Sequence, residues 1–144
     1  MNLNSRQLNH LKLCIDEAAS NVNRHAYSGM KVKKPMLLVE MQNAPEYVEI
    51  RVIDWGKIFS VDTESAKGKV DLEKYVETQR KGGLGLYMIH KFMDYVEWKR
   101  EKDRNILIMR QNVKRPEAYW KLFKKNLAWN KMSLKVKFSL ISGL

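Results

Sequence analysis

Residues 11–29 read LKLCIDEAASNVNRHAYSG, and this stretch decides the fold. Tyr27-Ser28-Gly29 closes it in the way that helix C-termini often end. The sequence therefore predicts a helix from Asn9 to His25 with one face packed on a core. The apolar residues that recur at helical spacing are Leu11, Cys14, Ile15, Ala18 and Val22.

Three polar side chains follow one another at intervals of four residues on the same helix: Glu17, Asn21 and His25. At about 100° per residue, Glu17 and Asn21 fall on the border between the apolar and the polar face. A border position is half-buried, so a carboxylate and an amide there can meet a ligand held against the core. The same placement also fits polar residues at the edge of an ordinary core.

A second motif follows a predicted strand. Residues 47–55, YVEIRVIDW, alternate apolar and polar side chains, which predicts a strand with one buried face. The strand runs into IDWGKIF, which carries Asp54 and Gly56. Asp and Gly at a strand end are also ordinary turn residues, so the motif is not specific by itself.

A third motif holds Gly82, Gly83 and Gly85 in residues 81–94, KGGLGLYMIHKFMD, where a helix is expected from about Leu84 to Tyr95. A glycine-rich turn at a helix N-terminus directs backbone N–H groups towards phosphate oxygens. The first motif adds an amide oxygen, which is a ligand type that Mg²⁺ prefers. The order and spacing of the three motifs predict a site for Mg²⁺ and a nucleotide.

The other periodic segments complete a fold prediction. Residues 57–81 have no sustained period and are expected to form a long mobile loop with a short helical stretch. A helix is expected after Pro116. Helices and strands in this order predict an α+β two-layer sandwich with an antiparallel or mixed sheet. The remaining strand candidates are MLLVEMQ (36–42), YVEWKRE (95–101), NILIMRQN (105–112) and SLKVKFSLI (133–141).

The composition is that of a globular protein. The 144 residues are 44% hydrophobic and 30% charged, which suits one cooperative core. The single cysteine, Cys14, excludes an intramolecular disulfide and a cysteine metal cluster within the sequence. There is no signal-peptide pattern and no run of about 18 apolar residues, so we expect a cytoplasmic protein without a membrane partner.

The positive charge is concentrated at the C-terminal end. Residues 114–144 hold eight Lys or Arg against one acid, so they carry +7 of the formal net charge of +11. We expect a nucleotide-binding domain over 1–113 and a basic helix-plus-strand extension over 114–144. Aromatic residues among the lysines leave a nucleic-acid-binding alternative open. Lysines around a helical aromatic stripe more often cover the outer face of a docked helix, so no direct nucleic-acid partner is expected.

The string E-x-x-x-N-x-x-x-H, then D-x-G after a strand, then G-G-L-G-L-Y at a helix start, resembles the GHKL ATPases. This superfamily includes gyrase, heat-shock chaperones, histidine kinases and mismatch-repair proteins. The likeness is strongest to the anti-sigma factor serine/threonine kinases and covers roughly Leu8 to Val113. It implies the Bergerat, or histidine-kinase-like, ATPase fold, with ATP and Mg²⁺ as cofactors.

The resemblance also implies a role for each residue. Glu17 would be the catalytic residue that orients or deprotonates the attacking hydroxyl, although an ion pair with Arg24 or Lys12 is an alternative. Asn21 would bind Mg²⁺, and Asp54 would accept a hydrogen bond from the amino group of adenine. The residues expected to approach the nucleotide closely through their backbone are Gly56, Gly82, Gly83, Gly85 and Leu86.

The sequence departs from the family pattern at three places. Ile58 replaces the second glycine of D-x-G-x-G-F, and Arg104-Asn105 replace a common Gly-Thr pair. The family usually has a strand and a helix before the glutamate helix, where this sequence has only about ten residues, so we expect either a fragment or another segment that covers that face. We expect the segment from Pro116 to Ile141 to cover that face, within one chain or between two chains of a homodimer.

The resemblance implies a Mg-dependent serine/threonine protein kinase. Its substrate would be an anti-sigma antagonist protein, and it would hold a sigma factor in an alternative complex. A nucleotide-dependent partner-binding switch without phosphotransfer is the alternative.

Overall fold

The computed structural model describes residues 3–59, 84–114, 118 and 133–139. The loop predicted over 57–81 lies outside the described residues beyond Phe59, and so do Gly82 and Gly83. The helix predicted after Pro116 lies outside them apart from Ala118.

The first helix begins earlier than the apolar periodicity indicated. Helix α1 spans Ser5–Asn21, and a π-helix (η1) continues it over Val22–Ala26. The N-cap is Asn4, whose side-chain Oδ1 accepts from Gln7 N at 2.8 Å. Gln7 Oε1 accepts in return from Asn4 N at 3.1 Å, which completes a capping box. The prediction from apolar spacing did not use this Asn-x-x-Gln pair and therefore placed the start of the helix at Asn9.

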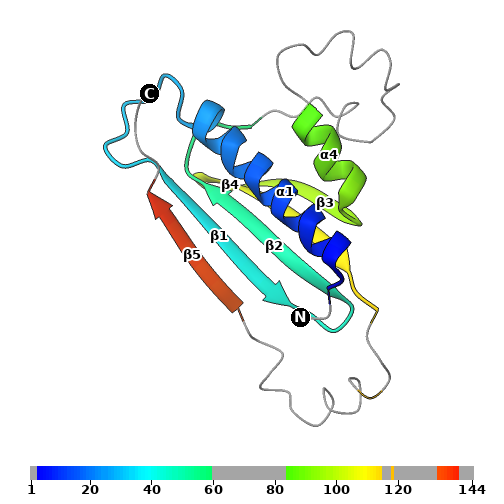
Figure 1. The fold of residues 1–144 in the computed structure, drawn as a ribbon. Coiled ribbons are helices and arrows are strands. Elements are labelled where there is room, and N and C mark those ends of the chain that lie inside the picture. Colours follow the sequence, from blue (N-terminus) through cyan, green and yellow to red (C-terminus); the bar gives the residue numbers. More distant parts are fainter. Residues whose placement is uncertain (1–2, 60–83, 115–117, 119–132, 140–144) are drawn as a thin grey trace.

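The described strands form one antiparallel sheet in the order β3-β4-β2-β1-β5. Figure 1 shows α1 and α4 on the same face of this sheet, which is the predicted α+β two-layer arrangement. The bounds are β1 Met36–Asn43, β2 Tyr47–Asp54, α4 Leu84–Phe92, β3 Tyr95–Glu101, β4 Arg104–Asn112 and β5 Ser133–Ser139.

The main core lies between the two helices and the sheet. On α1 the predicted apolar face is buried, with Cys14 at 0% exposure. Burial raises the pKa of the Cys14 thiol to about 12, so it is a neutral core group. The largest fully buried side chains of the sheet and α4 are Val48, Ile50, Val52, Ile89 and Met109.

The prediction that β2 buries only one face is wrong at Glu49, which is 2% exposed. Its carboxylate accepts from Arg51 Nε and Arg110 Nε, both at 2.6 Å. Burial alone would raise the pKa of Glu49, but the hydrogen bonds and charges of Arg110 and Arg51 outweigh burial and lower it. A second apolar cluster on neighbouring strands consists of Leu38, Ile53, Ile106 and Ile108.

Helix α4 ends at Phe92 rather than Tyr95 because the next residues join the sheet. Asp94 N donates to Arg110 O at 2.9 Å. Asp94 Oδ2 accepts from Gln111 Nε2 and from Asn112 N, each at 2.7 Å. These contacts turn the chain directly into β3.

Strand β5 pairs with the edge of β1, from Met36↔Ser139 to Gln42↔Ser133. The strand of the predicted C-terminal segment therefore joins the same sheet. The division into a domain over 1–113 and an extension over 114–144 stays a prediction.

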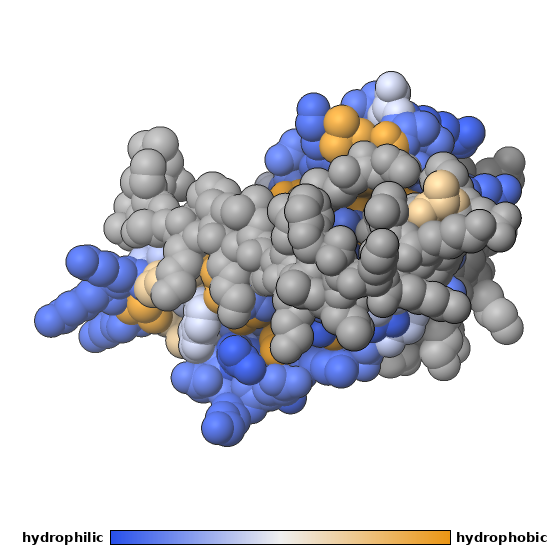
Figure 2. Space-filling model, turned by 90° about the horizontal axis from the view of Figure 1, so that it is seen from below, coloured by the Kyte–Doolittle hydropathy of each residue, from blue (hydrophilic) through white to orange (hydrophobic). Residues whose placement is uncertain are grey.

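The surface shown in Figure 2 is mainly hydrophilic where it is coloured, with hydrophobic residues in smaller groups. Within the described ranges, no helix is long and apolar enough to cross a membrane. The large hydrophobic residues that are exposed are Leu8, Leu13, Met30, Val32, Ile58 and Tyr95.

Candidate functional site

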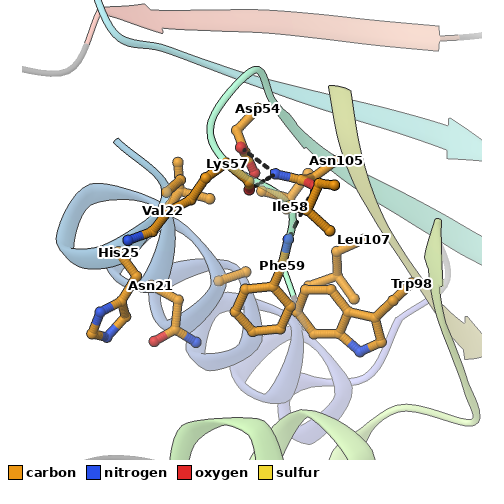
Figure 3. Close-up of a pocket in the computed structure, with 13 residues that line it drawn as sticks. Asn21, Val22, His25, Asp54, Lys57, Ile58, Phe59, Trp98, Asn105 and Leu107 are labelled. Carbon is orange, nitrogen blue, oxygen red and sulfur yellow. Dashed lines mark hydrogen bonds between the residues drawn. The ribbon is translucent and has the colours of Figure 1, made fainter. Parts of the chain in front are cut away.

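A pocket of about 280 Å³ lies between the end of α1 and the end of the sheet where β2 stops and β4 starts. Figure 3 shows that its labelled side chains come from the end of α1, from η1, from the end of β2 and the turn after it, and from strands β3 and β4. Most of the lining is apolar, with few polar groups, as is usual for sites that bind small molecules. It is lined by Ala18, Asn21, Val22, His25, Ala26, Val52, Asp54, Lys57, Ile58, Phe59, Trp98, Asn105 and Leu107.

Tyr27 joins the helix end to the two strands beside the pocket. Its hydroxyl donates to Met36 O at 2.6 Å and accepts from Met36 N at 3.2 Å. It also accepts from Trp55 N at 3.0 Å. This hydroxyl therefore sets the position of the Asp54-Trp55-Gly56 turn relative to α1.

Gly56 packs directly against the helix end. A Cβ at this position would overlap the carbonyl and the Cβ of Ala26. The next residue, Lys57, donates its N–H to Ala26 O at 2.8 Å. The glycine of the D-x-G motif thus permits a close approach between the turn and the helix that carries Asn21.

Asp54 is 6% exposed and points into this region (Figure 3). Its Oδ1 accepts from Gly56 N and from Asn105 Nδ2, each at 2.8 Å. No described residue donates a hydrogen bond to Oδ2. The second oxygen is therefore the one that can accept a donor from a ligand, such as an amino group.

Asn21 is half-buried and lines the pocket, while the exposed His25 lines it one turn later. Asn21 Oδ1 accepts from Arg24 Nη2 at 3.4 Å. Among the described residues, no group of three or more His, Cys, Asp or Glu could hold a metal ion by itself. A single amide oxygen is a ligand type that suits Mg²⁺, which is usually held by one or two protein ligands together with water and substrate phosphates.

Glu17 is half-buried but does not line the pocket. Its Oε1 lies 3.4 Å from Arg24 Nη2, so the predicted alternative of an ion pair with Arg24 is present. A Cβ at Gly85 would overlap the Glu17 carboxylate and its Cγ. The structure thus brings Glu17 of the first motif against Gly85 of the third, at the start of α4.

Leu86, also predicted at the site, is half-buried and packs against the main core. The structure therefore gives this side chain a packing contact. Its predicted contact with a nucleotide stays a prediction, as do those of Gly82 and Gly83.

Several pocket residues were missed by sequence reasoning. Phe59 and Trp98 stack in the pocket, with ring centroids 4.6 Å apart and an interplanar angle of 19°. Asn105 was noted only as a departure from the family pattern. Trp98 and Asn105 reach the pocket because β3 and β4 pair beside β2, which no local pattern reveals. Ile58, which replaces a family glycine, is 71% exposed.

The comparisons with known proteins agree with the motifs. Residues 1–111 match the family model described as a histidine kinase-like ATPase domain. Over 110 residues the chain is 34% identical to serine-protein kinase RsbW of Halalkalibacterium halodurans, covering 75% of this chain and 64% of that protein. Over 88 residues it is 34% identical to the protein of the same name from Listeria monocytogenes, covering 60% of this chain and 55% of the relative. The chain thus spans 55–64% of the length of these relatives.

Proposed function

The chain belongs to the histidine kinase-like ATPase family, and on this premise we propose that it binds Mg·ATP in the pocket beside α1 and phosphorylates a serine or threonine of a protein. The observation that carries the proposal is the convergence of the three motifs. Asn21 and Asp54 line one pocket, and Gly85 lies against Glu17.

The base would bind at the inner end of the pocket. Asp54 Oδ2 would accept a hydrogen bond from the exocyclic amino group of adenine, since its Oδ1 is already used twice. The Phe59 and Trp98 rings offer an aromatic surface for the base. The pocket of about 280 Å³ is at the lower limit for drug-sized ligands, which suits the base rather than the whole nucleotide.

The phosphates would extend towards Asn21 and the start of α4. Asn21 Oδ1 would hold Mg²⁺, which neutralises the charge that develops on the transferred phosphoryl group. The backbone of Gly82, Gly83 and Gly85 would donate N–H groups to phosphate oxygens. Arg24 must release Asn21 Oδ1 for this arrangement, and its side chain is 53% exposed, so it is free to move towards solvent.

Glu17 would orient the acceptor hydroxyl and receive its proton, and it is the only residue that the proposal makes catalytic. The relatives named serine-protein kinases support a protein substrate. We propose that this substrate is an anti-sigma antagonist and that a sigma factor is a second partner. We also propose that the protein itself is cytoplasmic and forms a homodimer.

A second candidate function is a nucleotide-dependent partner switch without phosphotransfer. The position of Glu17 favours it, because the carboxylate pairs with Arg24 and lies against Gly85 instead of lining the pocket. In this alternative the nucleotide selects which partner is bound, and Glu17 has a structural role.

A comparison of Glu17→Gln with wild type separates the two functions. Both proteins are incubated with labelled ATP, Mg²⁺ and a heat-inactivated cell extract, and phosphate incorporation into extract proteins is measured. The kinase proposal predicts that Glu17→Gln loses at least about 100-fold in rate, the lower end for acid–base catalysis. Binding of a non-hydrolysable ATP analogue should change by less than about threefold, because Glu17 does not line the pocket.

Asp16→Asn is the matched control, since Asp16 is an exposed acid next in the chain. It should transfer phosphate at the wild-type rate. Nucleotide binding with no transfer by wild type would contradict the kinase and favour the switch.

A further inference from the structure

We infer that Arg100 is a positioning residue of the base pocket: its guanidinium fixes the Asn105 amide and the Gly56 carbonyl, and so orients Asp54 and the turn that follows it. The inference rests on the proposed nucleotide binding. Arg100 lies on the edge strand β3 and does not line the main pocket. It would therefore act on the nucleotide only through other residues.

The Asn105 amide is the centre of the arrangement. Its Nδ2 donates to Asp54 Oδ1 at 2.8 Å and to Lys57 O at 2.9 Å. Its Oδ1 accepts from Arg100 Nη1 at 3.0 Å and from Phe59 N at 3.4 Å. An asparagine amide has two N–H donors and two lone pairs, and all four are used here. Because Asn105 is 6% exposed, water does not compete for them.

Arg100 determines which way this amide points. A guanidinium has donors and no acceptor, so only the oxygen of Asn105 can face it. The nitrogen must then face Asp54 and Lys57 O, which are acceptors. A flipped amide would direct its oxygen at the Asp54 carboxylate and its NH₂ group at the guanidinium. Two acceptors would then face each other at Asp54 and two donors at Arg100, and neither pair can form a hydrogen bond.

The same Arg100 nitrogen also donates to Gly56 O at 2.9 Å. One charged donor thus holds both the amide and the backbone of the D-x-G turn, and charge-assisted hydrogen bonds are stronger than neutral ones. The turn lacks the second family glycine, since Ile58 stands there, and Phe59 must stack on Trp98 to complete the pocket wall. Holding this segment in one conformation lowers the cost of ordering it when a ligand binds.

The neighbouring cations make different contacts. Lys99 Nζ lies 3.5 Å from Glu97 Oε1, and Arg104 Nη2 lies 3.1 Å from Glu101 Oε2, both on the same hairpin. In the part of the chain that the structure describes, Arg100 forms no ion pair with an acid and donates to the site instead. Arg104→Gln is therefore a matched control, because it removes one charge from the hairpin without touching the pocket.

The test is calorimetric titration of non-hydrolysable ATP and GTP analogues into wild type, Arg100→Gln, Arg100→Lys and Arg104→Gln. Arg100→Gln should bind the ATP analogue about tenfold more weakly, the loss expected for a charge-assisted hydrogen bond, and Arg104→Gln within twofold of wild type. The ratio of ATP to GTP affinity should also fall in Arg100→Gln, because a freed amide no longer fixes the Asp54 carboxylate. A purely structural loosening would weaken both nucleotides alike.

Arg100→Lys should recover part of the affinity, since an ammonium keeps the charge but presents it as a single point. It also decides the question if Arg100→Gln does not fold, because wild-type affinity and selectivity in Arg100→Lys would overturn the inference. Wild-type behaviour of a folded Arg100→Gln would overturn it too. No binding by wild type would instead overturn the proposed function and this inference with it.

Discussion

Gly56 and Gly85 each lie where a side chain would overlap a neighbour. Gly56 faces the carbonyl of Ala26, and Gly85 faces the carboxylate of Glu17. The contact of Gly56 lets the D-x-G turn pack against the helix end. The contact of Gly85 places the start of α4 against Glu17, the proposed catalytic residue. Packing therefore explains part of the requirement for glycine at these two positions, besides any contact with a nucleotide.

The contact between Gly85 and Glu17 predicts a specific coupling. Gly85→Ala should displace the Glu17 side chain, and because the obstructing atoms belong to one flexible side chain, the free energy of unfolding should fall by only about 1 kcal/mol. In a Glu17→Ala background the same substitution should cost much less, because the atoms that obstruct the new Cβ are gone. Urea unfolding of the four proteins measures this double-mutant cycle. Equal losses in both backgrounds would contradict the contact.

Strands β2 and β4 are joined outside the main core by the Glu49 ion pairs. Glu49 on β2 accepts from Arg110 on β4, whose guanidinium also lies over the rings of Tyr47 and Tyr95, at 4.7 and 4.5 Å. Since Asp54 ends β2 and pairs with Asn105 near the start of β4, the Glu49 contacts support the two strands that carry the base end of the proposed site.

The lowered pKa of Glu49 predicts a pH-dependent stability. Because the pKa in the folded state lies below its ordinary value of 4.5, ionised Glu49 stabilises the fold above that value. The stabilisation is lost as the pH falls through the lowered pKa. At pH about 7, Glu49→Gln should lower the free energy of unfolding by about 2 kcal/mol.

Urea unfolding should show the difference from wild type narrowing as the pH is lowered from about 7 to below 4.5, because the unfolded chain then takes up a proton more readily than the folded one. Glu46→Gln, in the exposed turn before β2, is the control and should follow wild type at both pH values. A constant difference between Glu49→Gln and wild type would refute the assignment.

The elements were largely predictable because their signals are local. The strand candidate YVEWKRE has the observed bounds of β3, whereas α1 starts at Ser5 instead of the predicted Asn9, behind a capping pair of Asn4 and Gln7 that apolar periodicity does not reveal. The π-helix had no such signal, and neither did the burial of Glu49, which depends on Arg110 from another strand.

At the scale of the whole molecule, the sheet order determines which residues form the site. The pairing β3-β4-β2 brings Trp98, Arg100 and Asn105 beside Asp54, although about 50 residues separate them in the chain. Strand β5 joins the opposite edge, beside β1. Asp54 and Asn21 could be predicted to share a site because the order of the motifs and the spacing within them resemble one family's nucleotide site. The family match supports that reading of the motifs.

The decisive measurement is calorimetric titration of a non-hydrolysable ATP analogue into wild type and Asn21→Ala, with and without Mg²⁺. We predict roughly micromolar binding that requires Mg²⁺, and a loss of most of this Mg²⁺ dependence in Asn21→Ala, because Asn21 lines the pocket and its amide oxygen is the proposed ligand of Mg²⁺. No binding by the folded wild-type chain, or binding indifferent to both Mg²⁺ and Asn21, would contradict a Mg·ATP site in this pocket.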